Sequence, residues 1–301
     1  MRSRIVTFAL VGFFISAPFA QAAMSSTNFE IRWDTISTGG SDTASSGSYL
    51  LRDAVEPAVA GSSSSSSYQL AQGYRSGVDD QIITFEVLTQ TTVSARAATA
   101  LSGLTVTAST SGISVDSLIA LVQNVGASQV TAIGKVASLG AGTITVDAWK
   151  DGGTAPTIDG TNDHVYPLTS TSVGFGELSA SSVSTAIIAF EVNAANDNGY
   201  TVQVFDDGNL RTTGYDIDDV TDGSVTAGSE EYGARSSDTT LTSSTFDTAD
   251  TALSTTFQDV ATESLTSFES RNFLTLKAAM SSLSGSVAYS HILSLIVSAN
   301  Y

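Results

Sequence analysis

The stretch STAIIAFEVNAANDNGYTVQVFDDG, residues 184–208, contains two strand patterns joined by a turn. Ala186 to Val192 is an apolar run, and Tyr200 to Phe205 alternates apolar and polar side chains at the period of a strand. Asn196 to Gly199 between them is a strong turn signal. Extended helical periodicity is absent from the chain, and only 4 of its 301 residues are proline. The sequence therefore predicts an all-β fold.

The same signals continue on both sides of this stretch. Residues 116–123 fit a strand or a short helix equally well, and residues 206–264 are rich in loops and acids. Further segments with strand character are 82–90, 104–107, 130–136, 143–146, 166–168, 273–278, 286–288 and 291–301.

These segments group into modules. Residues 79–95 and 169–301 predict a β-sandwich, and residues 96–168, with closely spaced short strands, predict a small β-barrel-like module inserted into it. Under this interpretation the strand at 82–90 pairs with strands beyond residue 173.

Residues 23–78 carry a short repeat of serines followed by an aromatic, any residue and an aliphatic. It occurs at Phe29-Glu30-Ile31, Tyr49-Leu50-Leu51 and Tyr68-Gln69-Leu70. This spacing predicts three short strands, with Gly39-Gly40 and Gly61 in the connections. The alternative for Ser62 to Ser67 is a flexible linker.

Residues 1–22 have the organisation of a secretory signal peptide. Arg2 and Arg4 precede an apolar segment from Ile5 to Ala17, and Ala20-Gln21-Ala22 matches the site that signal peptidase cleaves. An N-terminal membrane anchor is the alternative, but the apolar run is shorter than the ~20 residues that span a bilayer. We therefore expect a secreted protein, extracellular or at the cell surface, and no transmembrane helix.

Composition excludes several classes of function. The chain has no cysteine, two histidines and a net charge of −18. Disulfides, thiolate nucleophiles and zinc–cysteine sites are therefore excluded, and so is a basic surface for nucleic acid. The apolar content of 42% is too high for a wholly disordered chain.

An acidic segment between Asp206 and Glu231 raises the question of calcium. Asp216, Asp218 and Asp222 are the candidate ligands, since carboxylates at short spacing suit this ion. The EF-hand pattern fails because Val220 stands where a third ligand is needed. A solvated acidic loop is the alternative interpretation. We therefore predict no cofactor, with calcium left open, and commit no metal site.

No catalytic residue is predicted. The possible histidine bases are His164, expected in a loop, and His291, expected on a solvent-facing or partly buried face of the last strand. Neither accompanies a G-x-S-x-G nucleophile motif. Paired carboxylates in so acidic a chain are uninformative about glycoside hydrolysis.

Segments in the second half resemble secreted bacterial surface β-sandwiches, and loosely WxL-type and fimbrial-type domains. The matching segments are Phe175-Gly176-Glu177-Leu178-Ser179, Asn193-Ala194, Gly199-Tyr200, Tyr232-Gly233, Tyr289 and Tyr301. The W-x-L motifs themselves are missing. The repeat at 24–77 is also similar to the N-terminal element of uncharacterised envelope proteins of little-studied bacteria. The resemblance implies a surface role rather than a catalytic one.

The resulting expectation is a secreted envelope or surface protein that is structural or adhesive and not an enzyme. Its expected partners are other surface proteins, or another copy of itself through strand addition by the repeat, with glycans possible and nucleic acid excluded. The alternatives are a carbohydrate-binding or polysaccharide-active protein and an outer-membrane β-barrel, since residues 293–301 alternate and end in an aromatic.

Export predicts a defined new N-terminus. Expressed with its own leader, the protein should appear outside the cytoplasm with Ala23 as its first residue, because cleavage follows Ala22. N-terminal sequencing and intact mass measure this directly. An Ala22→Arg variant should stay uncleaved. Recovery of the full-length chain from the wild type would contradict the leader.

Overall fold

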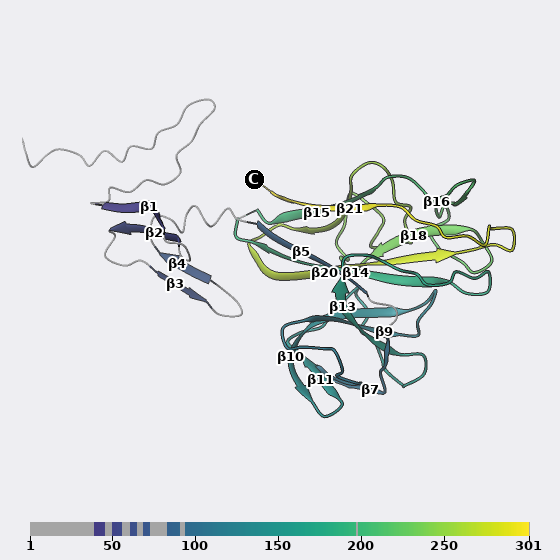
Figure 1. Cartoon of the computed structure of the whole chain (residues 1–301), viewed down its shortest axis with the longest axis horizontal. Helices are drawn as coiled ribbons and strands as arrows, with labels where there is room; N and C mark the ends of the chain where they lie inside the picture. The colour runs from purple at the N-terminus through teal and green to yellow at the C-terminus, as the bar shows by residue number, and fades with distance from the viewer. Residues whose placement is uncertain are drawn as a thin grey trace, which may run out of the picture. The chain divides into compact units, whose positions relative to one another are not determined.

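The computed structural model describes residues 39–45, 50–55, 61–64, 69–72, 83–90, 94–196 and 198–300 (Figure 1). These residues form 21 strands and no helical element. Paired strands are antiparallel in the described parts of the chain. The chain divides into two compact units, residues 1–79 and 80–301. The predicted all-β fold class is confirmed.

The first unit contains two strand pairs, β1 (Gly39–Ser45) with β2 (Leu50–Val55) and β3 (Gly61–Ser64) with β4 (Gln69–Gln72). Two of the predicted repeat strands fall at β2 and β4. The third, at Phe29 to Ile31, lies outside the described residues. Gly39, Gly40 and Gly61, predicted as connections, belong to strands, because ladder hydrogen bonds use only the backbone and tolerate glycine near a strand end.

The second unit contains one large sheet with the strand order β18-β20-β14-β5-β13-β9-β10-β11-β8-β7. In addition, β12 pairs with β10 and β6 pairs with β13. Its strands are β5 (Ile83–Gln90), β6 (Arg96–Ala97), β7 (Ala100–Ser102), β8 (Thr105–Thr107), β9 (Leu118–Gln123), β10 (Val130–Gly140), β11 (Thr143–Val146), β12 (Lys150–Asp151), β13 (His164–Ser170), β14 (Ser184–Ala194), β18 (Glu231–Ser236) and β20 (Ser267–Ala279).

Two smaller sheets complete this unit. One has the order β19-β15-β21 and the other pairs β16 with β17. Their strands are β15 (Tyr200–Asp206), β16 (Leu210–Thr212), β17 (Tyr215–Ile217), β19 (Gln258–Glu263) and β21 (Leu293–Ala299). Residues 206–264, predicted as mainly loop, therefore contain β16 to β19, while residues 286–288 form no strand. These short strands have too few residues for a clear period and acquire their structure from their pairing partners.

Strand β14 is buried on both faces, which explains its apolar run. Ile188, Phe190 and Val192 belong to a core cluster that also contains Tyr200 and Val202 of β15. The alternate residues of β14 point the other way. Side chains alternate between the two faces of a strand, and both faces of β14 are buried. Nearly every position of the strand is therefore apolar.

The opposite face of β14 packs on strands from residues 96–168. Ile187 and Ala189 share a cluster with Leu118, Tyr166 and Leu168. Figure 1 shows β15 and β21 on one side of β14 and β20, and β9 to β11 on the other. Residues 116–123, where strand and helix fit equally well, contain strand β9.

A third cluster lies within the strands between residues 96 and 168, around Val106, Ile119, Leu121, Ile144 and Val165. Strand β5 pairs with β14, with Phe85 opposite Val192, although about a hundred residues of chain separate them. This is the pairing that an insertion at 96–168 requires. The insertion and the module boundaries stay predictions.

A buried ion-pair network joins β14 and β20 to the loop between β11 and β12. Arg271 donates from Nε to Glu191 at 2.8 Å and from Nη1 and Nη2 to Asp147 at 2.7 Å each. The Arg271 and Glu191 side chains are only 7% and 11% exposed. Because each buried charge has an ionic partner, the network costs less than an unpaired charge would.

The turn between β14 and β15 depends on Gly199, whose φ is +69°. A Cβ there would overlap the Glu263 carbonyl and lie 2.9 Å from the Leu265 nitrogen. We predict that Gly199→Ala costs about 2–4 kcal/mol of unfolding free energy, through positive φ and overlap together. Gly142→Ala is the control, since Gly142 has φ +77° and an empty surrounding within 4 Å. Equal urea midpoints for the two variants would contradict this prediction.

Candidate functional site

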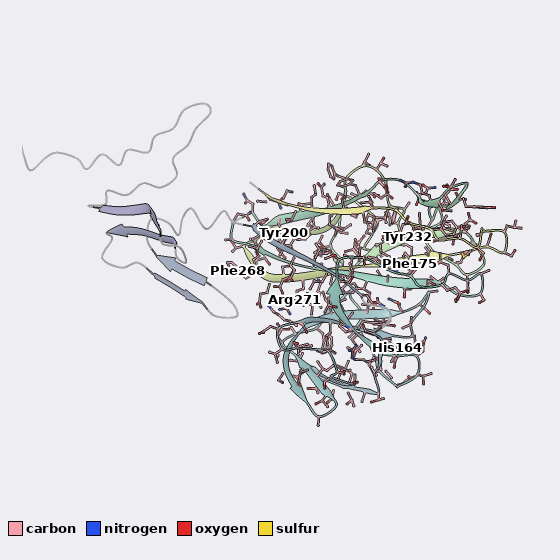
Figure 2. The ribbon with its side chains drawn as sticks, viewed as in Figure 1. His164, Phe175, Tyr200, Tyr232, Phe268 and Arg271 are labelled. Carbon is pink, nitrogen blue, oxygen red and sulfur yellow. The ribbon has the colours of Figure 1, made fainter. Side chains whose placement is uncertain are left out.

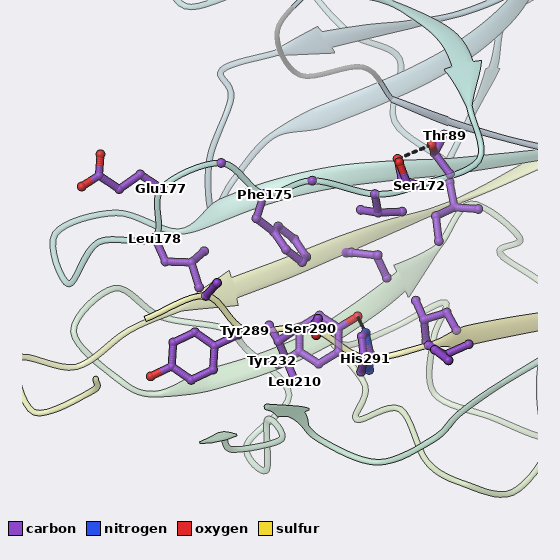
Figure 3. A pocket seen from close by; sticks show the side chains of 18 of the residues that line it. Thr89, Ser172, Phe175, Glu177, Leu178, Leu210, Tyr232, Tyr289, Ser290 and His291 are labelled. Atoms are coloured by element: carbon purple, nitrogen blue, oxygen red, sulfur yellow. Dashed lines mark hydrogen bonds between the residues drawn. The ribbon is translucent and has the colours of Figure 1, made fainter. Parts of the chain in front are cut away.

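A cavity of about 820 Å³ opens between β5 and β21 and is called the β5–β21 cavity below (Figure 3). Val87, Ile188 and Leu276 of the large sheet line one wall, and Leu293 and Leu295 of β21 line the other. Val87, Leu293 and Leu295 pack against the main core cluster but are only partly buried. The two sheets therefore leave inward-facing apolar surface exposed along this opening.

Residues 171–178, between β13 and β14, form part of the wall. The Thr89 hydroxyl donates to the Ser172 carbonyl at 2.8 Å, which fixes this segment to the end of β5 (Figure 3). Phe175 meets the ring of Tyr232 edge-on, with centroids 6.0 Å apart and planes at 88°. The F-G-x-L-S motif of the sequence thus contributes Phe175, one of the aromatic residues of the cavity.

The floor of the cavity contains a buried pair, Tyr232 and His291. The Tyr232 hydroxyl lies 3.0 Å from His291 Nε2, and the rings meet edge-on at 5.0 Å. His291 Nδ1 lies 3.3 Å from the Gly208 carbonyl oxygen and 4.0 Å from Asp206 Oδ2. Figure 2 shows Phe175 close to Tyr232, whereas His164 lies in the part of the unit that carries β9 to β11.

Burial determines the protonation states of His291 and Tyr232. Desolvation lowers the pKa of His291, against the opposing effects of the Gly208 carbonyl and Asp206. The ring is therefore neutral at neutral pH. Its contacts then assign the tautomer: Nδ1–H donates to Gly208, and Nε2 accepts the Tyr232 hydroxyl proton. Burial, reinforced by Asp206 and Asp219, raises the pKa of Tyr232 well above its usual value, so the phenol also stays neutral.

Asp219 is the most perturbed acid near this floor. Burial first, then repulsion by Asp206 and Asp218, raises its pKa to about 6. Its Oδ1 is buried without a hydrogen-bond partner. A carboxylate in this position destabilises the fold when it ionises.

This arrangement favours holding a ligand over covalent chemistry. The hydroxyl beside His291 belongs to a tyrosine whose raised pKa disfavours the nucleophilic phenolate. The hydroxyl proton and the Nδ1 proton both have acceptors already. His291 was expected in the last strand, but it precedes β21, and its side chain is 7% exposed.

The other histidine of the chain, His164, lies away from the cavity. It begins strand β13 rather than lying in a loop, so that placement was wrong. The cause is its pairing with Ala97 and Val122 on two neighbouring strands, which the local sequence does not encode. Its ring lies 5.9 Å from that of Tyr166, and its Nδ1 is buried without a hydrogen-bond partner.

The calcium candidates lie near β17. Asp216 accepts a hydrogen bond from the Asn209 side chain at 3.0 Å, and Asp222 accepts one from the Ser224 amide at 3.0 Å. The Asp218 carbonyl accepts from the Tyr232 amide. Among the described residues, no group of three or more histidines and acids is arranged to hold a metal ion. Calcium binding stays a prediction.

The sequence did not single out the cavity. Tyr232 and His291 are 59 residues apart, and Phe175 comes from a third segment. No spacing rule connects three such segments, since their meeting depends on the packing of two sheets. The one available signal was the resemblance, which grouped Phe175, Tyr232 and Tyr289 without stating that they share a site.

In the described part of the chain, no helix has the length and apolar character needed to cross a membrane. Comparisons with family profiles, curated proteins and solved structures give no match to this chain. The resemblance to surface proteins therefore stays a prediction, and the function is argued from the geometry above.

The raised pKa of Asp219 predicts a pH-dependent stability. Ionisation of this acid lowers the stability of the native protein as the pH rises from about 4 to about 6, so Asp219→Asn should melt higher than the wild type at pH 7.5 and equally at about pH 3, below the unfolded-state pKa. Because Asp219 is half-buried, screening limits the gain to about 1 kcal/mol, or about 2–4 °C. Thermal melts at both pH values measure this.

The control for lost negative charge is Glu86→Gln, an exposed position of β5. It should shift the melting temperature by less than Asp219→Asn at pH 7.5. Equal shifts for both variants, or a gain of the same size at about pH 3, would assign the effect to net charge and contradict the burial of Asp219.

Proposed function

We propose that this protein is secreted and has a structural or adhesive role at the cell surface, without catalysis. The observation that carries the proposal is the unpaired edge of β21. Within the described residues this strand pairs only with β15, and β5 pairs with β13 only at Thr89 and Gln90. Both edges flank partly exposed apolar side chains. An exposed edge beside apolar surface is a template for an added strand.

The proposed architecture of the second unit is a β-sandwich with an inserted barrel-like module. The cluster shared by β14, β20 and β15 supports the sandwich. The segment 96–102 supports the barrel, since its β6 pairs with β13 and its β7 pairs with β8, at opposite ends of the path β13-β9-β10-β11-β8. The insertion boundaries stay at residues 96 and 168.

The proposed partners are other surface proteins or another copy of this chain, joined by strand addition of the repeat at 24–77. The repeat alternates aromatic and aliphatic residues, as a strand that covers an apolar face requires. A net charge of −18 keeps the rest of the exterior solvated and limits nonspecific association.

Removing the apolar face of the repeat tests this proposal. The triple variant Phe29→Ser, Tyr49→Ser and Tyr68→Ser should lose self-association or surface retention, while the second unit keeps its melting transition. Sedimentation velocity of the purified chain and surface proteolysis of intact cells measure the two readouts.

The matched control replaces the polar residue before each aromatic, as Asn28→Ala, Ser48→Ala and Ser67→Ala, and should behave like the wild type. Deletion of residues 24–77 is the strongest form of the test. Unchanged assembly and stability after that deletion would refute strand addition by the repeat.

A further inference from the structure

We propose that the β5–β21 cavity binds a hydrophobic organic ammonium ion, a small molecule with an apolar or aromatic body and a cationic head. This inference concerns the cavity itself and does not depend on strand addition.

The size of the cavity fits a small organic molecule. Its volume of about 820 Å³ lies within the range of roughly 300–1,000 Å³ that ligand pockets occupy. Val87, Ile188, Leu276, Leu293 and Leu295 give it apolar walls contributed by two sheets. Such walls bind the body of a ligand by the burial of apolar surface.

Aromatic rings favour a cation over a neutral head. Phe175, Tyr232 and Tyr289 all line the cavity, from three separate segments of the chain (Figure 3). The faces of aromatic rings attract ammonium groups by about 0.5–2 kcal/mol each, most strongly where water is excluded. Phe175 and Tyr289 are only partly buried, so a ligand can contact them directly, whereas Tyr232 is fully buried.

The charges around the cavity have one sign. Its lining includes Glu177, whose carboxylate lies at the outer rim, and no lysine or arginine (Figure 3). Behind the floor lie Asp206, 4.0 Å from His291, and Asp219, which acts on Tyr232 electrostatically. The nearby cation Arg211 is paired with Asp207 at 2.9 Å. An anionic head would therefore meet repulsion and a cationic head attraction.

Hydrogen bonding points the same way. The Tyr232 hydroxyl donates its hydrogen bond to His291 Nε2, and His291 Nδ1–H donates to the Gly208 carbonyl oxygen. These two side chains therefore have no free proton to offer an anionic head, while the Tyr232 oxygen keeps acceptor capacity. A head that carries its own N–H donors matches this floor.

Three compounds with the same ring system test the assignment: 1-naphthylmethylammonium, 1-naphthalenemethanol and 1-naphthoate. Titration calorimetry with the full chain at pH 7.4 should show one molecule of the ammonium compound bound per chain, at least tenfold tighter than the alcohol, and no binding of the carboxylate. In 0.5 M salt the binding should weaken but keep its stoichiometry, because the partners lie in a cavity.

Two tryptophan variants of β21 locate the site. Leu293→Trp fills the cavity and should weaken ammonium binding at least tenfold. Ile296→Trp places the same ring on an outward-facing position of the same strand, 37% exposed, and should bind like the wild type. Equal loss in both variants would overturn the cavity as the site.

A third variant covers the case in which Leu293→Trp fails to fold. Glu177→Gln keeps an exposed side chain of the same size and should weaken the ammonium compound about threefold, with the alcohol unchanged. The proposal is overturned if the three compounds bind equally, if more than one ammonium binds per chain and salt abolishes it, or if Glu177→Gln changes nothing.

Discussion

The second unit depends on covering both faces of β14. Ile188, Phe190 and Val192 are buried on one face, and Ile187 and Ala189 on the other. If either face were left in contact with water, the exposed apolar surface would cost about 25 cal/mol of folding free energy per Å². One cover comes from β15, β19 and β21 and the other from strands of residues 96–168. The order of layers follows from this single strand and its neighbour β20.

Two-sided burial also explains where the buried charges are. Glu191 of β14 and Arg271 of β20 are cross-strand partners on the face toward residues 96–168, and Arg271 continues to Asp147 there. The ion pairs of Arg271 with Glu191 and Asp147 thus connect the strands of residues 96–168 to β14 and β20 at one place. Desolvation acts to raise the pKa of Asp147, but its hydrogen bonds to Arg271 and to the Ala148 and Lys135 amides lower it by more, so Asp147 is ionised at neutral pH. The ion pair lies between residues that are direct partners in the register of β14 and β20.

The parts of this architecture that were predictable are those encoded locally. The run at 186–192, the alternation at 200–205 and the turn at 196–199 gave β14, β15 and their connection, because period and turn residues reflect backbone geometry. Strands β16 to β19 were missed because they are short, lie in a loop-rich acidic segment and depend on their pairing partners. The cavity was missed for a further reason: Phe175, Tyr232 and His291 meet through the spacing of two sheets, a distance that no local pattern contains.

The separation of the large sheet from β21 at the cavity follows from the way β5 pairs with its neighbours. The strand pairs with β14 along its length but reaches β13 only at Thr89 and Gln90, where the large sheet continues toward residues 96–168. The sheet must turn there to cover the second face of β14, so it cannot also close over β21. Residues 171–178 partly fill the opening, and the space that remains is the β5–β21 cavity. Burying both faces of β14 thus leaves an opening at one edge of the core between the large sheet and β15, β19 and β21. Tyr232 and His291 lie at the floor of this opening.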